Sequence, residues 1–190
     1  LLIYGLDDLI IRRKMIEESD SNKNYKFYEN KRLDYLLSYC ESPECRRKTL
    51  LGYFDDTSNS CGNCDNCMNP PNLIDGTVLA QKLMSTIFRT GQFFGQVHII
   101  NVLRGSKDKK VIEKGHNHLS VYGIGEDKSI NFWQSFLRQL LAFGHLVINF
   151  QKYGAIQITD SGMKILTNKS QFLYRDIPDN VHSKINHKVK

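Results

Sequence analysis

Hydrophobic residues recur every three or four positions in the first part of the chain, which is the spacing of one face of an α-helix. A first helix is predicted over residues 7–18, and polar turn-forming residues at 19–24 end it. A second helix is predicted from about residue 25 to residue 40, and a shorter third helix over residues 44–54. The apolar face of the second helix consists of Leu33, Leu36, Leu37 and Cys40.

Two adjacent prolines, Pro70 and Pro71, interrupt this pattern and mark a boundary, because proline donates no backbone hydrogen bond and stiffens the chain. Five further helices are predicted, over residues 77–90, 96–103, 107–114, 129–143 and 160–166. Between the last two lie the β-rich runs 146–150 and 155–159, which predict a hairpin. A helical core followed by a two-stranded hairpin is typical of the winged helix.

The predicted fold class is therefore mainly α with a small β-hairpin, divided into two units. Residues 25–72 form a helical cysteine-containing subdomain, and residues 73–168 form a winged-helix domain. Residues 169–190 carry no periodic pattern, so we expect a polar tail there. Trp133, on the apolar face of the long helix over 129–143, is expected to be buried.

Four of the five cysteines have the spacing of a metal site. Cys61, Cys64 and Cys67 form a C-x2-C-x2-C run, and Cys45 precedes it with fifteen residues between them. We interpret them as the ligands of one structural zinc ion, since tight two-residue gaps turn neighbouring sulfurs inward. An iron–sulfur cluster is a weaker interpretation because the C-x3-C-P completion is missing, and disulfides are disfavoured by the odd cysteine count. Cys40 is expected to serve as a small core residue.

The formal net charge of +6 and the pI near 9.0 favour a polyanionic partner, most often nucleic acid. No apolar run is long enough to cross a bilayer and no leader pattern opens the chain, so we expect an intracellular protein without a membrane partner. The basic run Arg46-Arg47-Lys48 has two interpretations: contact with phosphate or an acidic neighbour, or a solvated, internally paired face. His116 and His118 flank a lysine-rich segment and form no ligand set.

Several motifs together resemble the C-terminal region of RecQ family DNA helicases, and bacterial members are the most similar in loop lengths. The resemblance covers nearly all of residues 1–168. The motifs that carry it are Tyr4-Gly5-Leu6, Cys45-Arg46-Arg47, Tyr53-Phe54, Cys61-Gly62-Asn63-Cys64-Asp65-Asn66-Cys67, Leu103-Arg104-Gly105-Ser106 and Tyr122-Gly123-Ile124-Gly125.

The resemblance implies a zinc-binding subdomain and a winged helix attached to upstream ATPase lobes, with residues 1–24 as the end of that lobe or a connector. The parent would be a 3′–5′ helicase of DNA repair, recombination and replication, using ATP and Mg²⁺, in the bacterial cytoplasm near the nucleoid. No G-K-[ST] phosphate loop occurs in this sequence, so this part alone is expected to lack catalysis. Implied partners are double-stranded and forked DNA, the helicase lobes and single-stranded-DNA-binding protein.

The same resemblance assigns Cys45, Cys61, Cys64 and Cys67 to zinc. It also implies phosphate contacts from the Arg-Gly-Ser segment, for which the alternative is that Arg104 caps its own helix. Where some members have a phosphate-binding lysine this chain has Gln134, and its hairpin loop is too short for the long strand-separating tip of some eukaryotic members. The predicted DNA-binding residues are Arg104, Ser106, Lys107, Lys109, Lys110, Gln134, Arg138, Lys152 and Tyr153.

Two other functions remain open at this point. A sequence-specific winged-helix transcription regulator would read bases with side chains of the long helix, namely Asn131, Gln134 and Arg138. A zinc-stabilised protein-interaction module would instead bind a protein partner and leave the basic charge without a role. Preference for one duplex sequence would favour the first, and indifference to DNA at low salt would favour the second.

Overall fold

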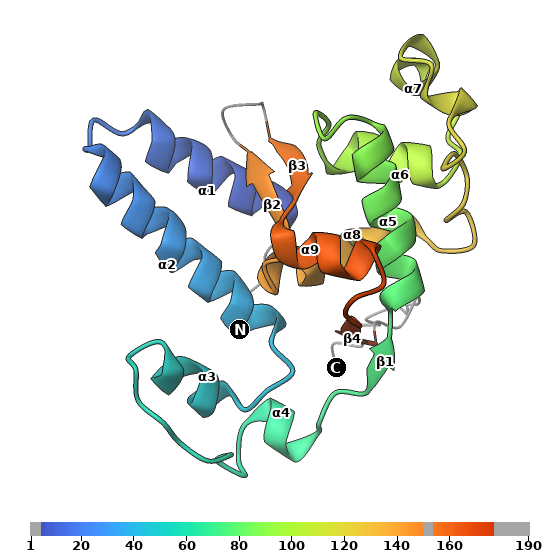
Figure 1. Cartoon of the computed structure of the whole chain (residues 1–190). Coiled ribbons are helices and arrows are strands. Elements are labelled where there is room, and N and C mark those ends of the chain that lie inside the picture. The colour runs from blue at the N-terminus through green and yellow to red at the C-terminus, as the bar shows by residue number, and fades with distance from the viewer. Residues whose placement is uncertain (1–4, 150–153, 177–190) are drawn as a thin grey trace, which may run out of the picture.

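A computed structural model describes residues 5–149 and 154–176 of the chain. The N-terminal part is helical, with α1 (Leu6–Glu18) and α2 (Lys23–Glu41) folded back on one another, followed by the short α3 (Arg46–Gly52) and α4 (Asp65–Met68) (Figure 1). The turn at residues 19–22 ends on Asn22, whose side chain accepts a hydrogen bond from the backbone N–H of Tyr25 at 2.8 Å and so caps α2. Within the described residues, no helix combines the length and the apolar character that a membrane span needs.

The second part has the predicted winged-helix order. Helices α5 (Thr77–Arg89) and α6 (Gln96–Leu103) lead through a segment with α7 (Lys109–Glu113) and the 3₁₀ turn η1 (His116–His118) to the long α8 (Ile130–Ala142). Strands β2 (Leu146–Asn149) and β3 (Ala155–Ile158) then pair antiparallel, with Leu146 opposite Ile158, and α9 (Asp160–Leu166) follows. The hairpin and the order of the helices confirm the winged-helix prediction.

The core lies where α5, α6 and α8 meet the hairpin. Trp133 and Phe136 of α8 are fully buried there, as are Leu83 of α5 and Leu103 of α6. The indole Nε1 of Trp133 donates to the Gly125 carbonyl at 2.8 Å, which satisfies the polar atom that burial takes from water. The expected burial of Trp133 is confirmed.

The expectation of a polar tail beyond residue 168 is wrong for residues 172–175. Strand β4 (Leu173–Arg175) pairs antiparallel with β1 (Leu73–Asp75), the segment that follows the two prolines (Figure 1). Phe172 and Tyr174 are buried, and their rings lie 5.5 and 5.0 Å from that of Phe136. This strand forms because tertiary packing supplies its partner, so a local polarity pattern does not predict it.

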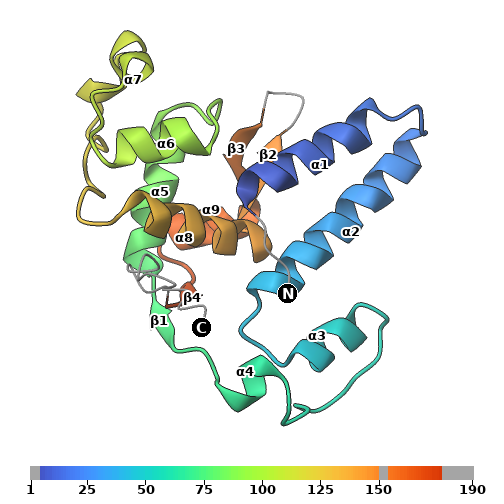
Figure 2. The same cartoon turned by 180° about the vertical axis from the view of Figure 1, so that it is seen from behind.

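The two parts share an interface along α2 and α8, visible from both sides of the molecule (Figures 1 and 2). Leu9 of α1 and Leu37 of α2 belong to the same buried apolar cluster as the winged-helix core. The Ser38 hydroxyl donates to the Ala142 carbonyl at the end of α8, at 2.7 Å. Helix α7 lies at the opposite end of the molecule from α3 and α4.

Candidate zinc centre and nucleic-acid interface

The four predicted zinc ligands converge at the ends of two short helices. Cys45 is the N-cap of α3 and Cys64 the N-cap of α4, while Cys67 lies within α4 and Cys61 in the loop before it. All four sulfurs lie within 4.8 Å of one another, and Cys61 Sγ is 4.0 Å from Cys67 Sγ. Tetrahedral zinc with Zn–S bonds of about 2.3 Å needs sulfurs about 3.8 Å apart, so the donor set fits the ion.

Backbone N–H groups favour the thiolate forms of Cys45 and Cys64 that zinc requires, whereas the hydrogen bond with Cys64 raises the pKa of Cys67 to about 11. Hydrogen bonds from the backbone of Lys48 and Cys61 lower the pKa of Cys45 to about 6, and the Cys61 N–H lies 3.3 Å from its sulfur. The backbone N–H of Arg46 likewise lowers the pKa of Cys64. Zinc supplies the positive charge that keeps all four sulfurs ionised, and four protein ligands leave no position for water. The centre is therefore structural.

Arg46 connects the cysteine-bearing loop to the end of α2, a role that the sequence pattern left open. Its Nη2 lies 3.0 Å from a carboxylate oxygen of Asp65, while Nη1 donates to the Tyr39 carbonyl at 2.6 Å. The same guanidinium lowers the pKa of Asp65. Asn66 adds hydrogen bonds to the carbonyls of Ser42 and Glu44. The position of Arg46 directly after the ligand Cys45 was the sequence feature that could have indicated this role.

The neighbouring basic residues are exposed. Lys48 pairs with Glu44 one helical turn earlier, at 2.9 Å, and Arg47 points to solvent. Of the two interpretations of the basic run, internal pairing therefore describes Arg46 and Lys48. Cys40 lies outside the ligand cluster. It is only partly buried and is not among the buried core residues of the described chain, so the expectation of a core residue is not met, although burial does raise the pKa of its thiol.

The Arg-Gly-Ser segment follows α6 directly. Arg104 is the C-cap of α6, half-buried, and its Nε donates to the Lys128 carbonyl at 2.9 Å. Among the described residues, none accepts a hydrogen bond from its two terminal nitrogens. Ser106 is half-buried too, and its Oγ accepts a hydrogen bond from the Asp108 N–H at 3.3 Å. Arg104 thus has a structural tether and keeps donors for an external group.

The predicted lysines continue the same surface. Lys107, Lys109 and Lys110 are exposed on and before α7, and Lys109 lies 3.6 Å from Glu113 of the same helix. Gln134 is half-buried on α8, and Asn131 of the same helix is exposed. His118 is exposed as well, but His116 forms a 2.8 Å hydrogen bond with His98 of α6. The exposed lysines among the predicted contacts that the structure describes therefore all lie in the loop after α6 and in α7.

Two of the predicted DNA contacts cannot be placed there, and one has another role. Lys152 and Tyr153 lie outside the described residues. The guanidinium of Arg138 is engaged inside the molecule: its Nε lies 3.3 Å from the buried carboxylate of Glu41 in α2, and its Nη2 donates to Ser135. The pairing follows from the contact between α2 and α8, two elements about a hundred residues apart, which periodicity alone does not reveal.

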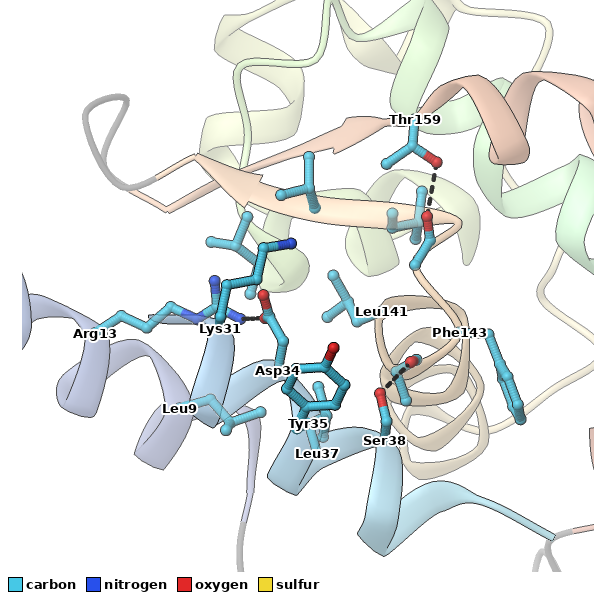
Figure 3. A pocket seen from close by; sticks show the side chains of 15 residues that line it. Leu9, Arg13, Lys31, Asp34, Tyr35, Leu37, Ser38, Leu141, Phe143 and Thr159 are labelled. Atoms are coloured by element: carbon cyan, nitrogen blue, oxygen red, sulfur yellow. Dashed lines mark hydrogen bonds and ion pairs between the residues drawn. The ribbon is translucent and has the colours of Figure 1, made fainter. Parts of the chain in front are cut away.

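A cavity of about 420 Å³ lies between α1, α2, the end of α8 and β2 (Figure 3). Leu9, Leu37 and Leu141 line it, and the ion pair between Arg13 and Asp34 lies at its rim. Its lining mixes apolar side chains with polar ones, and Lys31 lies there beside the Arg13–Asp34 pair. The cavity marks the seam between the two parts of the molecule, and we assign it no chemistry.

The fold and the cysteine cluster define a zinc-stabilised helical module joined to a winged helix. A RecQ zinc-binding family model matches residues 6–68, and an RQC domain model matches residues 70–181. The chain therefore belongs to the RecQ family, of which it comprises the zinc-binding and RQC domains.

Similar proteins agree with this assignment. The chain is 41% identical over 168 residues to an ATP-dependent DNA helicase RecQ of Haemophilus influenzae, covering 87% of this chain and 27% of that protein. It is 44% identical over 168 residues to the RecQ protein of Pasteurella multocida, covering 87% and 26%, and 29% identical over 167 residues to that of Bacillus subtilis, covering 87% and 28%. The chain thus spans about a quarter of the length of these relatives.

Proposed function

We propose that this chain is the DNA-binding region of a RecQ-type 3′–5′ DNA helicase that acts in DNA repair, recombination and replication. It would hold duplex or forked DNA for ATPase lobes that bind ATP and Mg²⁺ elsewhere in the parent protein. The observation that carries the proposal is the juxtaposition of a four-cysteine zinc centre and an adjoining winged helix, matched by the two family models. The role of this region is binding and not catalysis.

The proposed interface is the loop after α6 together with α7. Arg104 offers terminal guanidinium nitrogens, Ser106 a hydroxyl, and Lys107, Lys109 and Lys110 exposed ammonium groups. These groups suit phosphate oxygens, which all sequences share, so binding would be indifferent to sequence. The engagement of Arg138 with Glu41 removes one of the three side chains that a sequence-reading regulator would use, which favours the helicase role.

The test is fluorescence-anisotropy titration of the zinc-loaded protein with a forked duplex, a blunt duplex of unrelated sequence and a single strand, across a salt series. We expect tight, salt-sensitive binding to both duplexes. Arg104→Ala should weaken binding to every duplex about tenfold and reduce the slope of log Kd against log salt by about one. Arg47→Ala removes the same charge from the zinc subdomain and should have a much smaller effect.

Other outcomes distinguish the alternatives. A strong preference for one duplex sequence would favour a transcription regulator, and no binding at low salt would favour a protein-interaction module. Equal losses for Arg104→Ala and Arg47→Ala would indicate that only total charge matters and would remove Arg104 from the interface.

We further propose a division at the two prolines, with the zinc-binding subdomain over residues 25–72, the winged-helix domain over residues 73–168, and residues 1–24 as the end of the helicase lobe or the connector to it. The adjoining family matches that end at residue 68 and begin at residue 70 support this division. Single-stranded-DNA-binding protein as a partner and association with the bacterial nucleoid belong to the same proposal. Co-sedimentation of the full-length parent with each partner would test them.

A further inference from the structure

The loop that carries Arg104 and Ser106 has a defined helix-ending geometry. Ser106 N–H donates to the Asn101 carbonyl at 2.8 Å and Gly105 N–H to the Val102 carbonyl at 3.1 Å. This pair of bonds, with Gly105 at a φ of 68°, is a Schellman motif. The left-handed conformation at Gly105 turns the chain sharply, so the orientation of the next peptide groups depends on what holds them.

A second segment, Tyr122 to Gly125, lies against this helix end. Gly123 N–H donates to the Val102 carbonyl at 3.0 Å and Gly125 N–H to the Leu103 carbonyl at 2.8 Å, so the segment satisfies carbonyls of the last turn of α6. A Cβ on Gly105 would lie 3.2 Å from the Cα of Gly123. The close approach of the two glycines brings the Tyr122 ring alongside the loop.

The Tyr122 hydroxyl holds the loop carbonyls. Its Oη lies 2.9 Å from the Gly105 carbonyl oxygen and 3.2 Å from that of Ser106, in position to donate to either. The ring itself is half-buried and packs against a small apolar cluster of Val102, Val111 and Val121. One fixed hydroxyl therefore orients the two peptide groups that flank the Cα of Ser106, from which its side chain projects.

We propose that Tyr122 is a positioning residue for phosphate binding by the Arg104-Gly105-Ser106 loop, an inference that rests on the proposed DNA-binding function. A carbonyl oxygen carries partial negative charge and repels phosphate, whereas amide and hydroxyl groups attract it. The Gly105 and Ser106 N–H groups are engaged at the helix end, so once Tyr122 draws both carbonyls toward its hydroxyl, the Ser106 hydroxyl is left to donate to phosphate beside the Arg104 guanidinium. The residue acts through Ser106 and need not touch DNA itself.

The experiment is a double-mutant cycle with Tyr122→Phe and Ser106→Ala in the zinc-loaded protein, read by anisotropy with a blunt duplex. Tyr122→Phe keeps the ring and its packing, so the melting temperature should change little. We expect it to weaken DNA binding about three- to tenfold, the effect of one hydrogen bond. If Tyr122 acts through Ser106, the double variant should bind about as weakly as the weaker single variant. Tyr28→Phe, at an exposed tyrosine of α2, is the matched control and should bind as the wild type does.

An unchanged Kd in Tyr122→Phe would overturn the proposal. So would a double variant whose loss of affinity equals the product of the two single losses, because residues that act independently give that result. A second readout works without DNA: the amide NMR shifts of Gly105, Ser106 and Lys107 should move in Tyr122→Phe and not in Tyr28→Phe. Unmoved shifts would also refute the positioning role. If the wild-type protein binds no DNA, the proposed function fails, and the NMR comparison still decides whether Tyr122 orients the loop.

Discussion

Cys64 lies both at the start of α4 and in the four-cysteine cluster. It begins α4 as the N-cap, and its sulfur is one of four that lie within 4.8 Å of one another. Cys64→Ser should reduce the zinc content from one ion per chain to nearly none and unfold residues 42–69, because the binding energy of a structural zinc ion is folding energy. Metal analysis and far-UV circular dichroism measure both effects.

Cys40→Ser is the matched control for that substitution. Cys40 lies outside the sulfur cluster, so this variant should keep its zinc and its fold. A Cys64→Ser protein that retained a full equivalent of zinc would disprove the ligand assignment.

At the same scale, the sequence predicts residues whose roles depend on near neighbours and misses those whose partners are distant. The zinc ligands Cys61, Cys64 and Cys67 were predictable because a two-residue gap fixes how close their sulfurs can come. Arg138 was expected to contact DNA, but it pairs with Glu41, and nothing local to either residue indicates that contact. The same limit applies to Tyr122, whose loop partner lies sixteen residues earlier.

Helix α6 and the 3₁₀ turn η1 are joined by a histidine pair that makes the fold sensitive to acid. His98 Nε2 lies 2.8 Å from His116 Nδ1, and the His98 ring stacks on Phe94 with centroids 4.1 Å apart. Burial lowers the pKa of both rings, His116 lowers that of His98 further, and Lys114 adds to the effect on His116.

An unfolded chain would take up protons on these histidines at about pH 6.5, before the folded chain does. The contribution of the neutral histidine pair to stability is therefore complete above about pH 7. It is lost as the pH falls through about 6.5 toward the lowered pKa values of the two histidines in the folded state. As the pH is lowered from 7.5 to 5.5, the denaturation midpoint of the wild type should fall, and the midpoint of His98→Gln should fall less.

The exposed His118 provides the control, since His118→Gln should keep the full wild-type pH dependence. Zinc content must be measured at each pH, because acid also competes with zinc for the thiolates. Identical pH profiles for the wild type and His98→Gln would exclude the pair as a source of acid sensitivity.

Some helices and strands can be predicted from the hydrophobic pattern of the sequence, and others cannot. Helices α5 and α8 were predicted within a residue or two because their buried and exposed positions alternate with the helical period. Strands β1 and β4 have three residues each and pair with each other across about a hundred residues of sequence. Arg175 in β4 is fixed by Gln139 of α8, whose side chain accepts from its N–H at 2.7 Å and donates to its carbonyl at 3.2 Å. Such a strand forms only when its partners in the folded core are in place, so its own sequence does not predict it.

For the whole molecule, one buried carboxylate supplies the ion pairs between the zinc-bearing half and the winged-helix half, beside the shared apolar cluster. Glu41, at the end of α2, is 3% exposed. Its Oε1 lies 3.3 Å from Arg138 Nε in α8, and its Oε2 lies 3.1 Å from Arg175 Nη2 in β4. A single residue thus joins the zinc-bearing half to two separate elements of the winged-helix half, beside the hydrogen bond from Ser38 to the Ala142 carbonyl.

Glu41→Gln should loosen this junction. The variant keeps the size of the side chain but leaves the two guanidinium groups without the carboxylate that they share. We expect a loss of about 1–3 kcal/mol in the free energy of unfolding, less than for a fully buried pair because both arginines are partly exposed. Glu44→Gln, which breaks an exposed pair with Lys48, should cost no more than about 0.5 kcal/mol and is the control. Urea denaturation measures the stability, and small-angle X-ray scattering should report a larger radius of gyration for Glu41→Gln alone. If both variants were equally stable and equally compact, the carboxylate would not be what joins the two halves.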